Sequence, residues 1–344
     1  MNDSPASLQP EDLPRDHSTL ARVHHFLHHT PSFVSLVVLL VSVVVFGLIL
    51  GSKFFSPFAL TLILQQVAIV GIVASAQTLI ILTAGIDLSV GAIMVLSSVT
   101  MGQVAFRYGL PPEIAVLACF AVGGLCGAIN GVLVAYVRLP PFIVTLGMWQ
   151  IVLATNYIYS ANETIRSQDI AESAPLLQFF GNKINIGGAI FTYGVIAMFV
   201  LVVVLAYALK HTAWGRHVYA VGDDPDAAEL SGVQVKKIFL SVYILGGLIC
   251  ALAGWALVGR IGSISPTAGQ YTNIESITAV VIGGISLFGG RGSIFGALFG
   301  ALIVGVFSLG LRLIGTDPQW TYWFIGLLII IAVAVDQWIR KAAT

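Results

Sequence analysis

The sequence is poor in charged residues, and that shortage excludes most classes of protein. Of its 344 residues only 9% are charged and 57% are hydrophobic, and the mean hydropathy is +0.94. A water-soluble domain carries about 25% charged residues, so this composition indicates a chain that lies mostly in a lipid bilayer, with membrane lipid as a partner. Sixteen basic and sixteen acidic residues give a net charge of zero, which predicts no nucleic-acid partner.

Cysteine and metal-ligand patterns are scarce as well. The chain has three cysteines, and Cys119, Cys126 and Cys250 all lie within apolar stretches, where we expect small buried side chains and no disulfide. His24, His25, His28 and His29 are spaced so that a helix could bring them to one metal ion. No other ligand type accompanies them, so we favour an interfacial, partly charged helix face and predict no metal site.

The motifs of soluble catalysis are missing too. There is no Gly-xxxx-Gly-Lys-Ser/Thr phosphate loop, no HExxH and no serine elbow. We therefore expect no ATP hydrolysis and no bound cofactor on this chain. A membrane-embedded enzyme would need a paired acid and base, and a proton- or sodium-coupled carrier would need a central charged relay. Asp87 and Glu275 are the only candidate residues for these two roles.

Long apolar stretches dominate what is there. A span needs about 17 to 25 residues, and ten stretches qualify, which predicts an all-α polytopic integral membrane protein. The ten lie near residues 33–51, 58–83, 88–106, 113–137, 141–160, 188–209, 238–259, 274–290, 293–313 and 319–338. The fifth and the eighth carry polar residues, so either could be a broken or re-entrant helix.

Basic residues indicate the orientation of these spans. With the N-terminus inside, ten Lys and Arg residues fall on the inner side and six on the outer side, which favours a cytoplasmic location for both termini. Residues 1–32 show no cleavable signal pattern. We therefore expect a cytoplasmic segment over 1–32, a transmembrane domain over 33–338 with a cytoplasmic loop at 210–237, and a cytoplasmic tail over 339–344.

That loop is the one long polar stretch between spans. It contains WGRHVYAVGDDPDAAELSGVQVKK, which predicts a short capped helix on the cytoplasmic face. Asp223, Asp224 and Asp226 can accept hydrogen bonds from first-turn amides, Pro225 suits a first helical position, and Gly232 suits a stop. Asp226 and Glu229 have the spacing of a capping box. The alternative is a solvated loop with one helical turn.

Two glycine-rich segments share the pattern Gly-xxx-Gly-Ala-xx-Gly. One contains Gly123, Gly127 and Gly131, and the other Gly292, Gly296 and Gly300. They fall in the fourth and ninth predicted spans, so an odd offset of five would make the two copies run in opposite directions, as in an inverted five-plus-five repeat. The other interpretation is close helix packing by small residues, with which a repeat is compatible.

Polar residues within the spans are candidates for a translocation pathway, because each is costly unless it faces a partner, water or substrate. Our candidates are Gln77, Asp87, Ser89, Asn130, Asn156, Asn273 and Glu275. A lining of amides and hydroxyls suits a neutral polyol better than an ion, whereas helix-to-helix hydrogen bonding is the alternative for each of them. Asp87 could also cap the third span.

Three motifs together resemble the permease subunits of bacterial sugar ABC importers of the ribose, xylose and fructose type. They are TAGIDLSVGA at 83–92, AVGDDPDAAELSGV at 220–233 and GGISLFGGRGSIFGALFGAL at 283–302. Their order and spacing match as well, from about residue 35 onward. The resemblance implies a homodimer in the bacterial inner membrane, a cytoplasmic ATP-binding subunit that holds ATP and Mg, and a periplasmic sugar-binding protein.

The resemblance also assigns the coupling helix that contacts the ATPase. It implies Asp223, Asp224, Pro225, Asp226, Ala227, Ala228, Glu229, Leu230, Ser231 and Gly232, with Asp226 where many permeases of this type have Glu. The expected function is ATP-driven import of a monosaccharide by alternating access, with fructose favoured over ribose or xylose. The alternative is an ATP-independent channel or secondary carrier for a small neutral solute.

Overall fold

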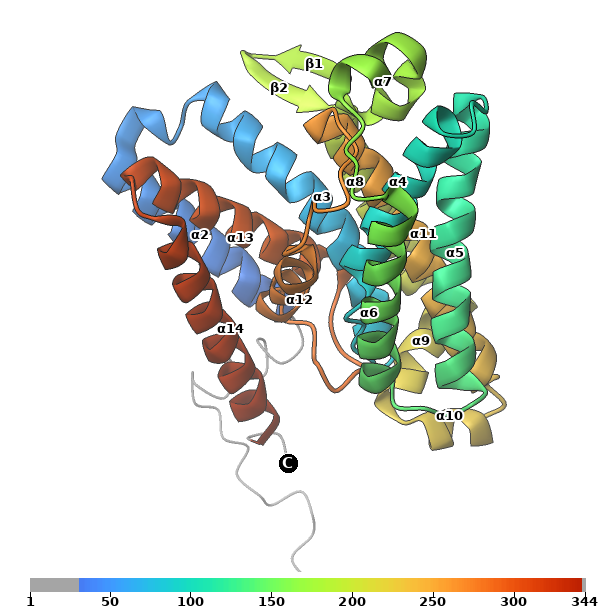
Figure 1. The fold of residues 1–344 in the computed structure, drawn as a ribbon. Coiled ribbons are helices and arrows are strands. Elements are labelled where there is room, and N and C mark those ends of the chain that lie inside the picture. The colour runs from blue at the N-terminus through green and yellow to red at the C-terminus, as the bar shows by residue number, and fades with distance from the viewer. Residues whose placement is uncertain (1–30, 342–344) are drawn as a thin grey trace, which may run out of the picture.

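The computed structural model describes residues 31–341, and over that range the chain is almost entirely helical (Figure 1). The predicted all-α polytopic fold is confirmed; the histidines at 24–29 lie outside the described residues. The elements are α2 Pro31–Leu50, η2 Gly51–Lys53, α3 Pro57–Leu82, α4 Val90–Phe106, α5 Pro112–Ala135, α6 Pro141–Ser160, α7 Ser167–Ser173, η3 Pro175–Gly181, β1 Lys183–Ile186, β2 Ala189–Thr192, α8 Tyr193–His211, α9 Ala213–Asp223, α10 Pro225–Leu230, α11 Val235–Ile261, α12 Thr272–Ile282, α13 Ile294–Ile314 and α14 Pro318–Lys341.

Seven of the described helices are long and apolar enough to cross a membrane: α2, α3, α5, α6, α8, α11 and α13. Shorter apolar helices occupy the other three predicted stretches, in α4, α12 and the Gln319–Ile331 part of α14. Each of the ten stretches predicted from the sequence therefore contains a helix.

Two of the predicted spans need correction. The eighth is broken, as one of its two interpretations had it, because α12 ends at Ile282 and a glycine-rich loop follows in which Gly284, Gly289, Gly290 and Gly292 have positive φ. The sixth begins five residues later than predicted, since 189–192 forms β2 of a small antiparallel hairpin and α8 starts at Tyr193. The fifth span, α6, is continuous.

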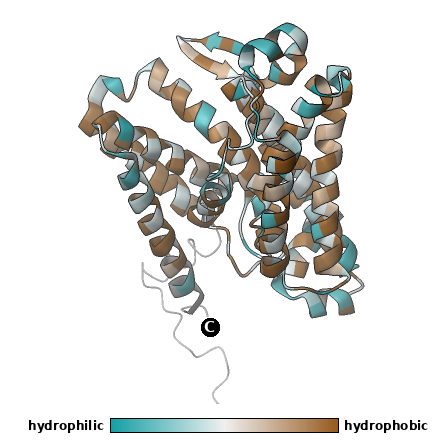
Figure 2. Cartoon of the chain, viewed as in Figure 1, coloured by the Kyte–Doolittle hydropathy of each residue, from teal (hydrophilic) through white to brown (hydrophobic). Residues whose placement is uncertain are grey.

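Polar segments gather at two opposite ends of the molecule. Figure 1 shows α9 and α10 at one end and α7 with the β1–β2 hairpin at the other. Hydrophilic residues colour both ends in Figure 2, and the helices between them are mainly hydrophobic. This distribution is typical of a chain whose middle lies in a bilayer. We call the α9–α10 end, which holds the predicted coupling segment, the coupling end, and the opposite one, which the basic residues predict to face outward, the outer end.

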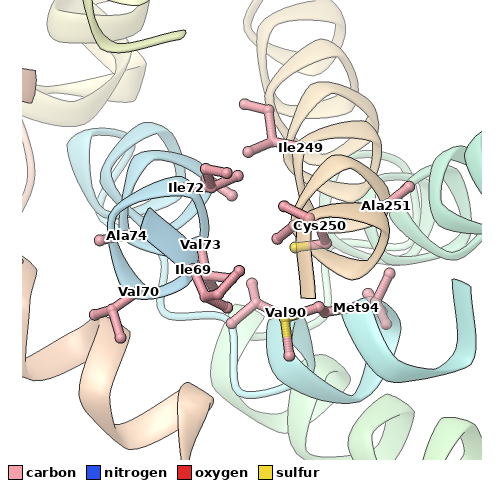
Figure 3. Close-up of a cluster of buried hydrophobic side chains, with 14 of the residues drawn as sticks. Ile69, Val70, Ile72, Val73, Ala74, Val90, Met94, Ile249, Cys250 and Ala251 are labelled. Atoms are coloured by element: carbon pink, nitrogen blue, oxygen red, sulfur yellow. The ribbon is translucent and has the colours of Figure 1, made fainter. Parts of the chain in front are cut away.

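The core lies where α3, α4 and α11 converge. Figure 3 shows side chains of the three helices, among them Val73, Met94 and Cys250, pointing toward one another. Every residue of α3 from Val67 to Leu82 is buried. Because α3 and α11 are apolar on all sides and enclosed by other helices, they form the centre around which the remaining helices pack.

The two glycine-rich helices run in opposite directions. α5 ends at the coupling end, where Tyr136 lies under Lys236, 5.9 Å from the ammonium to the ring centre. α13 begins at that end, since Gly292 just before it contacts Tyr219 of α9. Opposite direction is what an inverted repeat requires. The repeat itself stays a prediction.

Candidate functional site

The segment Thr83–Ser89 between α3 and α4 folds back along the end of α3 inside the protein. Its turn is fixed by Gly85, whose amide donates to Ile80 O at 3.0 Å. About one turn further into α3, the side-chain amide of Gln77, oriented to satisfy both groups, donates to the carbonyl of Asp87 (3.0 Å) and accepts from its N–H (3.2 Å). The chain therefore re-enters the core before α4 starts.

Asp87 organises the start of α4. Its Oδ1 accepts hydrogen bonds from both the amide and the hydroxyl of Ser89, each at 2.6 Å, and its Oδ2 lies 3.4 Å from Nδ2 of Asn130. The same Nδ2 donates to Ser89 Oγ at 3.0 Å. The N-cap residue of α4 is Ser89 and its side chain caps nothing, so Asp87 holds the residue before the helix and is not itself the cap.

Asn273 joins the starts of the two short helices, α4 and α12. Its Oδ1 accepts from the amide of Gly91, and its Nδ2 donates to Leu88 O at 2.6 Å. At 1.5 Å per residue, α4 and α12 are about 26 and 17 Å long, both short of a hydrocarbon core of about 30 Å. Two helices shorter than the hydrocarbon core thus begin side by side within the bundle, as discontinuous helices do in many transporters.

Five of the seven predicted pathway residues therefore meet at one buried junction: Gln77, Asp87, Ser89, Asn130 and Asn273. All of them hydrogen-bond within the protein, so at this junction they act as connections between helices. Their predicted role in a pathway stays a prediction. The other two lie nearer the outer end, where Asn156 of α6 donates to Pro266 O at 2.8 Å and Glu275 lines a cavity described below.

The predicted coupling segment contains two helices, not one. α9 ends at Asp223, and α10 covers Pro225–Leu230 with Asp224 as its N-cap. Asp224 Oδ1 accepts from the amides of Asp226 and Ala227, at 2.9 and 3.0 Å. Pro225 takes the predicted first helical position, but Asp226 lies within the helix, so the proposed capping box of Asp226 and Glu229 is wrong.

The surface of α10 is open on the coupling end. Ala228 is buried and anchors the helix, whereas Asp226, Ala227 and Glu229 are exposed. Leu230 is 91% exposed, the largest value among the exposed large hydrophobic residues of the described chain. Ser231 follows as the C-cap, and Gly232 ends the segment at φ +86°, which confirms the expected stop.

α9 is hydrogen-bonded to two separate parts of the helix bundle, α11 and the α12–α13 loop. Trp214 Nε1 donates to Ser241 Oγ of α11 at 2.8 Å, and Tyr219 OH donates to Gly292 O of the α12–α13 loop at 2.8 Å. Burial raises the pKa of Tyr219, so its phenol stays protonated and remains a donor at neutral pH. Tyr219 thus connects α9 directly to the loop that follows α12.

Gly222 makes the closest of these contacts. A side chain at this position would overlap the carbonyl oxygen of Leu82, the last residue of α3, and would crowd the amide of Gly290. Gly290 N donates to the same carbonyl at 3.0 Å. Three segments meet at this point: the end of α9, the end of α3 and the α12–α13 loop. Only a residue without a side chain allows this approach.

The predicted packing glycines have distinct partners. Gly123, Gly127 and Gly131 of α5 lie against α11, where a Cβ would overlap backbone atoms of Gly247 and Tyr243 and come within 3.1 Å of Leu240. Gly296 and Gly300 of α13 lie against α12 in the same way. Gly292 differs from the prediction, because it lies in the loop before α13 with φ +134° and packs on Ile285.

A cavity of about 350 Å³ opens beside α12 toward the outer end. Its walls come from α3, the end of α11, the loop after it and the start of α12, and include Glu275. Most of this site was not predicted from the sequence, because Arg260 and Gln270 look like ordinary residues near helix ends and Gln66 like one polar residue within an apolar span. The available signals were the polar residues in apolar helices, Gln66 in α3 and Arg260 in the last turn of α11.

Residues 59–333 match the family described as branched-chain amino acid transport system / permease component. The chain belongs to this family. Its known relatives include the fructose import permease protein FrcC of Rhizobium meliloti, 72% identical over 95% of this chain and 91% of that protein. The ribose import permease protein RbsC of Escherichia coli K12 is 37% identical over 88% of this chain and 92% of its own length.

A third relative of the permease family is the xylose transport system permease protein XylH of Haemophilus influenzae. It is 29% identical over 90% of this chain and 96% of its own length. The family match covers the two short helices α4 and α12, the predicted coupling segment and the glycine-rich helices. The chain is thus a permease, a transporter component, and the predicted family resemblance is confirmed.

Proposed function

We propose that this chain is the membrane-spanning subunit of an ATP-driven importer that moves a monosaccharide from the periplasm to the cytoplasm of a bacterium. The observation that carries the proposal is the 72% identity, over 95% of the chain, to a protein named as a fructose import permease. Fructose is therefore the first substrate to test, and ribose and xylose follow from the more distant relatives.

The proposed partners follow from what the chain lacks and exposes. A cytoplasmic ATP-binding subunit supplies ATP and Mg and contacts α10 through Leu230 and the exposed Glu229. A periplasmic binding protein delivers the sugar, and a second copy of the chain completes the permease in the inner membrane. In this arrangement both termini and the coupling end face the cytoplasm, as the distribution of basic residues favours.

The proposed mechanism uses the contacts of α9. When the ATPase closes on ATP it displaces α10 and α9, and the contacts of Tyr219 and Gly222 carry this displacement to the α12–α13 loop and to the end of α3. α12 then moves relative to α4, to which Asn273 connects it. Opening alternately to the two sides of the membrane is the expected outcome of such rigid-body movements.

The test is uptake of labelled fructose, ribose and xylose by cells lacking this chain, with and without a restored copy. The proposal predicts that one sugar's uptake returns with the copy and collapses when cellular ATP is depleted while the proton gradient is maintained. Uptake that survives ATP depletion would instead support a secondary carrier or channel. A Glu229→Lys copy, charge-reversed on α10, sharpens the comparison, because only the ATP-driven importer should lose transport at normal membrane levels.

A further inference from the structure

The cavity beside α12 is lined like a site for a small neutral polyol. Its volume of about 350 Å³ falls within the range of small-molecule sites, about 300 to 1,000 Å³. The floor is apolar, with Ile69 and Val70 of α3 and Leu257 of α11, all three of them buried. The remaining lining side chains are mostly polar, so the cavity offers both apolar and hydrogen-bonding surface.

The polar lining residues offer both hydrogen-bond donors and hydrogen-bond acceptors. Arg260 Nη2 donates to Gln66 Oε1 at 2.7 Å, which orients both side chains into one network. Glu275 adds a carboxylate acceptor on the α12 side, and Thr272 adds a hydroxyl. With one positive and one negative side chain the lining has no net charge. It therefore favours a neutral ligand rich in hydroxyl groups over a free ion, and Glu275 opposes a phosphate.

An aromatic side chain completes the lining. Tyr271 is half-exposed beside the cavity, and its ring packs on that of Tyr322 of α14 with ring centres 5.3 Å apart. Gln270 beside it donates to Tyr157 OH of α6 at 3.3 Å, so the loop is connected to a neighbouring helix. An aromatic side chain beside hydrogen-bonding groups is the kind of lining that suits a sugar ring, which has apolar C–H groups as well as hydroxyls.

We infer that this cavity binds the transported monosaccharide directly, on its way through the permease. The inference rests on the proposed function and deepens it, since it assigns sugar contact to Arg260, Glu275, Gln66 and Gln270. The location on α12 gives the site a means of control: Asn273, between the lining residues Thr272 and Glu275, bonds to the start of α4. A movement of α12 driven from the coupling end would reshape the cavity wall.

Protection of a single cysteine from labelling tests this site on the full chain in membranes. The native Cys119, Cys126 and Cys250 are buried, so a water-soluble maleimide should react mainly with an introduced thiol. Thr267→Cys places that thiol at the exposed lining of the cavity, and Glu172→Cys, on the exposed surface of α7, is the matched control outside it. Fructose or ribose is added at concentrations up to 100-fold above the one that gives half-maximal protection. Glycine betaine at equal osmolality is the solute control.

We expect fructose to slow labelling of Thr267→Cys at least threefold and to leave Glu172→Cys unchanged. In the double variant Thr267→Cys, Glu275→Gln, about tenfold more sugar should be needed for the same protection. Equal labelling rates with and without sugar, or equal protection at both positions, would overturn the inference.

The same materials separate this inference from the proposed function. ATP-dependent uptake by the unmodified chain without any protection of Thr267→Cys would refute the cavity and leave the importer intact. Protection together with ATP-independent uptake would keep the cavity and refute the importer. As a folding control, Glu172→Gln should transport at the wild-type rate, whereas Glu275→Gln should lose at least tenfold in rate at an unchanged membrane level.

Discussion

Gly222 is the residue on which the coupling contact depends most. Because a methyl group there would overlap the carbonyl of Leu82, Gly222→Ala must separate α9 from α3 and from the α12–α13 loop. Overpacking of this kind costs about 1 to 3 kcal/mol, so we expect a lower thermal transition temperature in detergent and at least tenfold slower uptake. Gly147→Ala in α6, where an added methyl group would meet nothing within 4 Å beyond its own stretch of helix, is the matched control and should change neither.

Asp87 gives a second prediction at this scale, because two substitutions differ in what they leave unpaired. Asp87→Asn keeps an acceptor for Ser89, and Asn130 can turn its Oδ1 toward the new amide, since that oxygen accepts no hydrogen bond among the described residues. Asp87→Ala leaves the two buried donors of Ser89, its amide and its hydroxyl, without this acceptor, and each lost hydrogen bond lowers the stability by about 1 to 3 kcal/mol. Thermal stability should fall in the order wild type, Asn, Ala. An Asn variant as unstable as the Ala variant would contradict this assignment.

Tyr219 allows a test by removal of one hydroxyl. Tyr219→Phe deletes the 2.8 Å hydrogen bond to Gly292 and keeps the ring. We expect the free energy of unfolding to fall by about 1 kcal/mol, and sugar uptake to slow while the partner's ATP hydrolysis is maintained. Burial raises the pKa of this phenol above its usual value of about 10. Stability from the neutral donor is thus complete below about pH 10 and is lost only above it. Wild type and variant should therefore share one pH profile of uptake between about pH 6 and 9.

Among the elements, α10 depends on a single cap. A six-residue helix is marginal in water, and Asp224 satisfies two of its free amides. Asp224→Ala should cost about 0.5 to 2 kcal/mol locally and speed hydrogen exchange at the amides of Asp226 and Ala227. Asp226→Ala, which removes an exposed carboxylate of the same helix that is not its cap, is the control. Equal exchange in the two variants would remove Asp224 from this role.

The positions of helices were predictable where they depend on hydropathy alone. Long apolar stretches such as α3 and α11 were located to within a few residues, because nothing else satisfies their backbone in a bilayer. α12 was predicted too long because the apolar residues after Ile282 belong to a loop buried by α9, an arrangement that hydropathy does not register. The β1–β2 hairpin was missed for a similar reason, since its apolar strand β2 runs directly into α8.

The residues of the candidate sites were only partly predictable. Costly polar groups such as Asp87 and Asn273 could be named from the sequence, but their meeting at the starts of α4 and α12 follows from tertiary packing. The Gly222 contact and the cavity at Arg260 combine segments more than 130 residues apart in the chain, such as α3 and the α12–α13 loop. No local pattern reports such pairs.

For the whole molecule, the contacts form one continuous path from the coupling end to the cavity. It runs from α10 through α9 to the α12–α13 loop, along α12 and, through Asn273, to α4. Its links are the hydrogen bond of Tyr219, the close backbone contact of Gly222 and the hydrogen bonds of Asn273, and connected contacts of this kind can carry energetic coupling between sites. The account therefore predicts that sugar movement and ATP hydrolysis on the partner are obligatorily linked.

The most direct test is uptake of labelled fructose into proteoliposomes that contain the purified complex of this chain with its ATP-binding subunit. Sugar-loaded binding protein is supplied on one side and ATP with Mg on the other. The account predicts accumulation only with hydrolysable ATP, and loss of accumulation for Gly222→Ala at a retained rate of ATP hydrolysis. Accumulation without ATP, or a Gly222→Ala complex that still couples hydrolysis to uptake, would contradict it.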